Sequence, residues 1–259
     1  VMRDLVGALE RERPDAARGA RLAIVEVSPR LREQQAMALA GRELRWATTA
    51  HGIAPIHGLI FANEVLDAFP VHVLVRTDEG VREVYVDEHD GALVETLRPP
   101  GHADLRWRVP QALPIGGRWE VSTAAESWVA QVAAALTSGY LLLVDYADEE
   151  AGLLARMGAG TVRGFSRHRL VGDPLERPGE MDITATVDLT AIRRAAEGAG
   201  LRLVGTGTQR CAQIEAVLAV REDARQSAAC GVIEVEAIGE DGERAGRQAR
   251  PVRTRCSTA

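Results

Sequence analysis

Carboxylates follow directly after two apolar, strand-like stretches of the sequence. Glu26 lies near the end of the stretch 21–27, and Glu64 and Asp67 follow the stretch 58–62. In open α/β sheets, ligands bind beyond the carboxyl ends of the strands, so these positions are candidates for a site. A carboxylate at the end of an early strand suits the two hydroxyls of a ribose, as in dinucleotide-binding folds. The spacing of Glu26 fits equally well a solvated acid at a strand end.

The second group, Asn63, Glu64 and Asp67, is predicted to begin a short helix over residues 63–68, because asparagine can cap a helix and Pro70 prevents a long one. Residues three apart share a helix face, so Glu64 and Asp67 would form a carboxylate pair. Such a pair suits an arginine guanidinium, which binds carboxylates through two donors. The alternative is a pair of ordinary first-turn acids stabilised by the helix dipole.

A third group follows the most apolar stretch of the chain, 140–145, which ends in Asp145 and Tyr146. The loop beyond it contains His168, a candidate general base. A single histidine among arginines is more commonly just solvated. The sequence shows no Ser-His-Asp set, no HExxH zinc motif and no P-loop.

Hydrophobic periodicity predicts the elements that position these residues. Helices are expected over 1–12, 28–39 (with Ser28 as cap and Pro29 in the first turn), 123–139 and 188–199. Strands are expected over 21–27, 44–48, 58–62, 140–145 and 201–204, and β-rich stretches over 71–76, 81–87 and 92–97 read as an antiparallel meander. The fold class is α/β: a doubly wound, mostly parallel sheet with an inserted β meander over about 71–120.

Composition excludes several classes of function. The chain has 259 residues, 31 basic and 37 acidic, and a formal net charge of −6, which argues against a nucleic-acid binder with a broad basic surface. No apolar run approaches the ~20 residues of a membrane span, and no secretory signal opens the chain. Three widely spaced cysteines fit neither a disulfide framework nor a zinc site, so no metal is expected. We therefore expect a cytoplasmic protein.

Several segments together resemble the MidA family of S-adenosylmethionine-dependent methyltransferases, related to the mitochondrial complex I assembly arginine methyltransferase. The resemblance covers residues 1–210 and rests on VEVSPRLREQQ (25–35), ANEVLDAFPVH (62–72), LVDYA (143–147), GTVRGFSRH (160–168), DPLERPGEMDITATVDL (173–189) and GTGTQ (205–209). It implies a class I methyltransferase fold and S-adenosyl-L-methionine as cofactor. It also implies a protein substrate, with an arginine of a complex I subunit or of another protein as the acceptor.

The resemblance places Glu26 at the ribose-binding position and Asn63 in the lining of the cofactor and substrate cleft, with Ser28 beside the cofactor. Glu64 and Asp67 would orient the acceptor, and His168 would remove its proton. A non-catalytic assembly or binding factor that keeps the fold is the alternative, and a nucleotide-binding protein of other chemistry is a third.

The sequence also departs from the family pattern. The family's glycine-rich loop would precede Val1, so we expect a gap in the middle of the sheet, with unpaired strand edges. Ala147, Thr186 and Leu189 stand where the family usually has glycine, histidine and phenylalanine. We expect one methyltransferase-like domain over 1–221 and a poorly ordered tail over 222–259, which has few large apolar residues.

Overall fold

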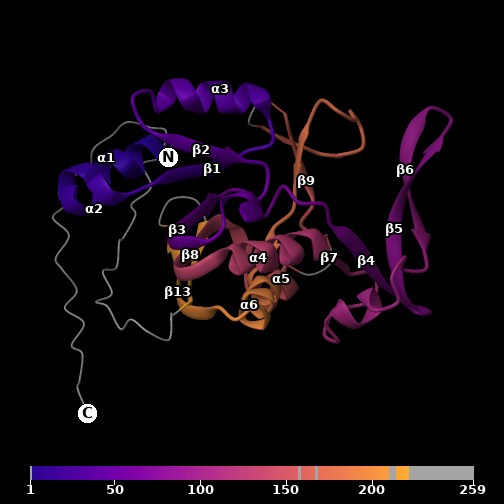
Figure 1. Cartoon of the computed structure of the whole chain (residues 1–259). Coiled ribbons are helices and arrows are strands. Elements are labelled where there is room, and N and C mark those ends of the chain that lie inside the picture. The colour runs from indigo at the N-terminus through magenta and orange to yellow at the C-terminus, as the bar shows by residue number, and fades with distance from the viewer. Residues whose placement is uncertain (1, 157–158, 167–168, 210–213, 222–259) are drawn as a thin grey trace, which may run out of the picture. The chain divides into compact units, whose positions relative to one another are not determined.

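The computed structural model describes residues 2–156, 159–166, 169–209 and 214–221, all of which belong to one compact unit. Figure 1 shows their helices and strands in chain order. The predicted tail, 222–259, and His168 lie outside the described residues.

The main sheet is built around β8 (Leu136–Asp148), the apolar stretch that the sequence marks as a central strand. β3 (Ile56–Asn63) pairs with β8 in parallel, and β12 (Val187–Asp188) pairs in parallel with the last residues of β8. β14 (Ile214–Arg221) lies antiparallel between β8 and β13 (Arg202–Gln209). The parallel arrangement is confirmed, whereas β14 was not predicted.

A separate two-stranded parallel sheet holds β1 (Leu22–Val25) and β2 (Leu44–Ala47). Among the described residues, β1 pairs only with β2, and β3 pairs only with β8. Val25 and Leu59, one on each of these strands, are 41% and 46% exposed. Each of these two strands therefore has one edge that pairs with no other described strand.

Helices α1 (Met2–Glu12) and α2 (Pro14–Gly19) precede the small sheet in the sequence, and α3 (Pro29–Ala38) connects its two strands. α3 begins as predicted, because the Ser28 hydroxyl accepts the backbone N–H of Leu31 at 3.3 Å and Pro29 opens the helix. The 3₁₀ helix η1 (Ala50–Ile53) contacts β1, β2 and the helix α4 (Thr123–Ala135), and so connects the small sheet with the main core.

The predicted meander is a four-stranded antiparallel sheet in the order β6–β5–β4–β7. Its strands are β4 (His72–Thr77), β5 (Gly80–His89), β6 (Ala92–Arg98) and β7 (Arg118–Val121). The meander is confirmed; the four-residue β7 was not predicted, because it is separated from β6 by a long connection that contains η2 (Leu105–Arg108). This sheet has its own apolar core around Leu74, Leu105 and Trp119.

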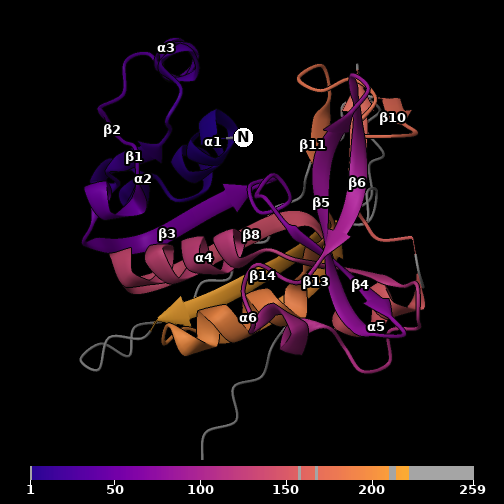
Figure 2. The same ribbon diagram turned by 90° about the vertical axis from the view of Figure 1, so that its right-hand side faces the viewer.

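The main core forms where α4 and α6 (Leu189–Gly198) contact each other and β8, as Figure 2 shows. Val129, Val132, Leu136 and Leu141 are completely or almost completely buried there. The remaining elements are α5 (Glu150–Ala155) and a small sheet of β9 (Arg163–Ser166), β10 (Arg169–Val171) and β11 (Asp182–Thr184). α6 begins and ends as predicted, with Asp188 as cap and Gly200 at φ +83°.

Two details of α4 and β8 differ from the prediction. Thr123 and Glu126 form a T-x-x-E capping box in the sequence, which predicts Thr123 as the cap. In the structure Ser122 is the cap, since its hydroxyl accepts the N–H of Ala125 at 3.2 Å. The helix ends at Ala135, so Gly139 lies inside β8, where the prediction made it the end of the helix. A Cβ at Gly139 would stand 2.0 Å from the carbonyl oxygen of Gly58, which explains a glycine in the middle of a strand.

Candidate active site

Asp145, near the carboxyl end of β8, organises the turn that follows β3. Its Oδ2 accepts the backbone N–H groups of Val65 at 3.1 Å and Leu66 at 2.7 Å, and its Oδ1 accepts that of Tyr146 at 2.9 Å. The residue is only 3% exposed, so these N–H groups satisfy a buried carboxylate. The N–H of Glu64 extends the pairing of the strands by donating to the Val144 carbonyl at 2.8 Å.

The helix predicted over 63–68 is therefore wrong. Residues 64–70 form bends and turns, with Glu64 at φ +50°, a conformation that residues other than glycine rarely adopt. The physical reason is that β3 continues through Asn63 and Glu64 then turns the chain with a positive φ, a turn that Asp145 holds by accepting the N–H groups of Val65 and Leu66. Because there is no helix here, Glu64 and Asp67 are not first-turn helix acids, and that alternative is wrong.

Asp67 lies in a strongly acidic environment. It is 7% exposed, and its backbone carbonyl accepts the N–H of Ala185 at 3.1 Å, which joins the turn to the segment after β11. Burial and the nearby carboxylates of Asp145, Glu64 and Asp182 raise the pKa of Asp67 to about 7. Glu64 and Asp67 are thus electrostatic neighbours, as predicted, although no helix face brings them together.

Tyr146 belongs to the same cluster. It is 43% exposed, and burial of its hydroxyl, followed by the charges of Glu64, Asp67 and Asp145, raises its pKa. The sequence pointed to Asp145 and Tyr146 as the end of a central strand but gave them no role. Asp182 was not a candidate either, although its position in the PGEMDITA segment could have indicated it.

Glu26 lies one residue beyond β1, where it is half-buried and held in place by two hydrogen bonds. Its Oε1 accepts the N–H of Ser28 at 2.9 Å, and its Oε2 accepts the side-chain amide of Gln35 at 3.0 Å. The indole N–H of Trp46 donates to the Gln35 oxygen at 3.1 Å and so orients that amide. A carboxylate has about four lone-pair sites, so Glu26 keeps acceptor capacity for a ligand.

The candidate residues therefore form two groups. Glu26 and Ser28 belong to the β1–β2 sheet and the start of α3, whereas Asn63, Glu64 and Asp67 belong to the end of β3. Asn63 is the last residue of β3 and is paired with Val144. Within the described residues, no group of three or more His, Cys, Asp or Glu side chains could hold a metal ion, and no helix is long and apolar enough to cross a membrane.

The structure has an oriented carboxylate, Glu26, after the parallel strand β1, and an acidic cluster after the parallel strand β3. This arrangement is typical of α/β proteins that bind their ligands at the carboxyl ends of the strands. The chain belongs to the family described as "Putative S-adenosyl-L-methionine-dependent methyltransferase", whose model matches residues 1–207. The family expected from the sequence is confirmed, and so is the α/β methyltransferase-like fold class.

Individual proteins agree with this assignment. The chain is 31% identical over 223 residues to the mitochondrial protein arginine methyltransferase NDUFAF7 of Danio rerio, a match that covers 74% of this chain and 50% of that protein. It is 29% identical to the human protein of the same name, over 68% of this chain and 44% of that protein. The chain thus spans about half the length of the curated relatives it matches.

A solved structure is also similar. A COG1565 superfamily member from Burkholderia thailandensis, bound to S-adenosyl-homocysteine, superimposes with a TM-score of 0.75 at 27% identity. The match covers 85% of this chain and 68% of that chain.

Proposed function

We propose that the protein transfers the methyl group of S-adenosyl-L-methionine to a nitrogen atom of an arginine in a protein substrate. The observation that carries this proposal is the cluster of three carboxyl groups at the carboxyl ends of β3 and β8, in which Asp67 and Asp145 are buried and Glu64 is exposed. Family membership and the names of the relatives, which are protein arginine methyltransferases, support the same reaction.

Glu26 is the residue that we expect to hold the cofactor. Its carboxylate is fixed by Ser28 and Gln35 yet keeps free lone pairs, so it fits two ribose hydroxyls. Ser28 supports the cofactor site by holding Glu26, because its backbone N–H donates to the Glu26 carboxylate while its hydroxyl caps α3. The cofactor supplies an electrophilic methyl group on a positively charged sulfur. We keep Asn63, the last residue of β3, as a further cofactor contact.

Glu64 and Asp67 are the residues that we expect to hold the acceptor. The three charged groups that act on Asp67 are all carboxylates, so a guanidinium would be attracted to this position. When the nitrogen forms its bond to the methyl group, the methyl–sulfur bond breaks and the nitrogen loses a proton. A carboxylate with a pKa of about 7 can accept that proton near neutral pH. His168 remains an alternative acceptor for the proton.

Calorimetry with S-adenosylhomocysteine tests the cofactor half of the proposal. We expect the natural full-length protein to bind it, and Glu26→Gln to weaken binding about tenfold or more, because the amide replaces one acceptor oxygen with a donor. Glu43→Gln is a matched control in the same part of the chain. Absence of binding to the natural protein would favour the non-catalytic binding factor.

Glu64→Gln and Asp67→Asn test the acceptor half. Each variant keeps the shape of the side chain and removes its charge, so methyl transfer to arginine should fall while affinity for S-adenosylhomocysteine stays the same. Transfer is followed with isotopically labelled S-adenosylmethionine and mass spectrometry of the product protein. If both variants transfer the methyl group as fast as the natural protein, Glu64 and Asp67 do not hold the acceptor.

A further inference from the structure

The small sheet of β9, β10 and β11 rises from the main sheet and is anchored at its base (Figures 1 and 2). The residues before and after it are joined there, because Thr161 donates its N–H to the Glu120 carboxylate at 2.9 Å and its hydroxyl accepts the N–H of Thr186 at 3.1 Å. The N–H of Ala185 donates to the backbone carbonyl of Asp67 at 3.1 Å. The small sheet therefore has a fixed place beside the turn that carries the acceptor-holding carboxylates.

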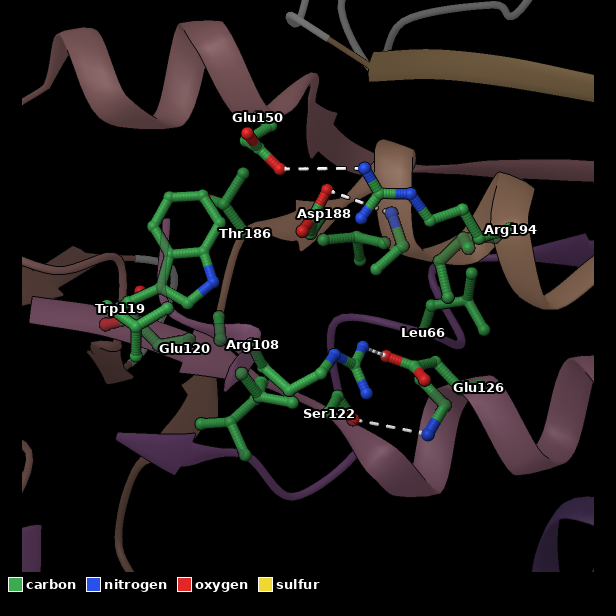
Figure 3. A pocket seen from close by; sticks show the side chains of 18 of the residues that line it. Leu66, Arg108, Trp119, Glu120, Ser122, Glu126, Glu150, Thr186, Asp188 and Arg194 are labelled. Atoms are coloured by element: carbon green, nitrogen blue, oxygen red, sulfur yellow. Dashed lines mark hydrogen bonds and ion pairs between the residues drawn. The ribbon is translucent and has the colours of Figure 1, made fainter. Parts of the chain in front are cut away.

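The cavity shown in Figure 3 belongs to this anchor. It has a volume of about 180 Å³, and both Glu120 and Thr186 line it. Two of its other acids also have partners within the chain, since Glu126 pairs with Arg108 and Asp188 caps α6. The charged groups of the cavity thus hold neighbouring segments of the protein together beneath the small sheet.

One face of the small sheet is covered by the protein itself. Gly164, in the central strand β9, is buried, and a Cβ there would stand 3.3 Å from the sulfur of Met181 and 3.4 Å from the Cα of Pro174. Both of these residues belong to the segment that connects β10 with β11. This segment therefore packs on the face to which Gly164 and its paired residue Ile183 belong.

The opposite face carries three residues in register across the strands. Leu170 of β10 pairs with Phe165 of β9, which pairs in turn with Asp182 of β11. Residues paired in this way point to the same face of a sheet. Leu170 is 65% exposed, and Phe165 is half-buried. An apolar surface is thus left open on this face.

The row of Leu170, Phe165 and Asp182 begins at the acidic cluster. Burial contributes most to the raised pKa of Asp67, and the Asp182 carboxylate contributes as well, so Asp182 lies close to the acceptor-holding residues. The row therefore leads from the acceptor site to the exposed leucine.

We propose that Phe165 and Leu170 bind an apolar side chain of the protein substrate, two positions from the acceptor arginine. The inference rests on the proposed function, in that the arginine beside Asp182 is the methyl acceptor. Neighbouring strands lie about 4.8 Å apart, so Phe165 is about 5 Å and Leu170 about 10 Å from Asp182 along the row. An extended peptide places alternate side chains on the same side, about 7 Å apart, and the second of them would lie between Phe165 and Leu170. An apolar side chain fits there because neither residue offers a charge or a hydrogen-bonding group.

Calorimetry with two synthetic peptides and the natural full-length protein tests the proposal. The first peptide is acetyl-Gly-Leu-Gly-Arg-Gly-Leu-Gly-amide, and the second has serine in place of both leucines. Leucine on each side of the arginine makes the test independent of the direction in which the peptide binds. We expect the leucine peptide to bind about tenfold more tightly, because serine buries almost no apolar surface. Equal affinities, or no binding of either peptide, would overturn the proposal.

Leu170→Ser locates the contact. Because Leu170 is exposed, this variant should keep the Tm nearly unchanged, and it should remove most of the preference for the leucine peptide. Ile183→Ser is the matched control, since it removes an apolar side chain of the same size, 46% exposed, from the other face of the same sheet. The control should keep the tenfold preference. A preference that survives Leu170→Ser would overturn the proposal.

The outcomes separate this inference from the proposed function. A preference that depends on Leu170, without methyl transfer to either peptide, would support the binding surface and refute the reaction. Methyl transfer to both peptides with the same kcat/KM and the same affinity would support the reaction and refute the binding surface. Glu64→Gln should abolish methyl transfer and keep the ratio of the two affinities, because it changes only the contact with the arginine.

Discussion

Replacing Asp145 with asparagine tests whether this carboxylate builds the turn that carries Glu64 and Asp67. Asp145 is 3% exposed and accepts backbone N–H groups through both oxygens. An asparagine keeps one acceptor oxygen and places an NH₂ group where the other oxygen was. If its oxygen stays with Val65 and Leu66, the N–H of Tyr146 loses its partner.

The expected cost follows from this loss. A buried N–H without a partner costs about 1–3 kcal/mol, and removal of a buried charge offsets part of that cost. We expect Asp145→Asn to lower the free energy of unfolding by about 2 kcal/mol, which corresponds to a fall in Tm of about 4–8 °C for a domain of this size. The Asp145 charge also raises the pKa of Asp67, so the variant should bring the pKa of Asp67 down from about 7.

Urea denaturation gives the stability, and NMR titration of the Asp67 carboxyl gives its pKa. Asp188→Asn is a matched control, because Asp188 caps α6 and asparagine is an equally good N-cap, so its cost should be a few tenths of a kcal/mol at most. Unchanged stability of Asp145→Asn together with an unchanged pKa of Asp67 would show that Asp145 does not organise the turn.

Three further predictions concern other parts of the structure. The pKa of Asp67 is raised from 3.8 to about 7 in the folded protein, so folding favours the uncharged carboxyl. The stability that results is fully present below about pH 4 and is lost as the pH rises through 7. Asp67→Asn should therefore match the natural protein at pH 4 and exceed its unfolding free energy by about 2–4 kcal/mol at pH 8 in urea denaturation. Gly139→Ala should prevent folding or lower the Tm severely in a thermal scan, because its Cβ would lie 2.0 Å from the carbonyl oxygen of Gly58. Gly205→Ala is the control and should have little effect on the Tm, because a Cβ at Gly205 would lie in open space. Trp46→Phe removes the N–H that orients the amide of Gln35, and calorimetry should show S-adenosylhomocysteine binding several-fold more weakly, with the Tm nearly unchanged.

Elements with local signals could be predicted from the sequence. α3 and α6 begin where Ser28 and Asp188 can accept a backbone N–H, and the structure shows both hydrogen bonds. The meander follows from alternating residues around short turns.

Features that depend on contacts between distant residues could not be predicted. The turn over 64–70 looks like a helix start in the sequence, but Glu64 adopts a positive φ there, and Asp145, about 80 positions away, holds the N–H groups of Val65 and Leu66 in the turn. The raised pKa of Asp67 has the same origin, because Asp145 and Asp182 come from other segments. Glu26 could be proposed from its position, but its orientation by Gln35 required the structure.

A crystal structure of the full-length protein with S-adenosylhomocysteine and an arginine-containing peptide would test the central claim most directly. We expect the ribose hydroxyls on the Glu26 carboxylate and the acceptor guanidinium between Glu64 and Asp67, with its nitrogen facing the cofactor sulfur. A ribose bound away from Glu26, or a guanidinium that contacts neither Glu64 nor Asp67, would contradict the proposed site.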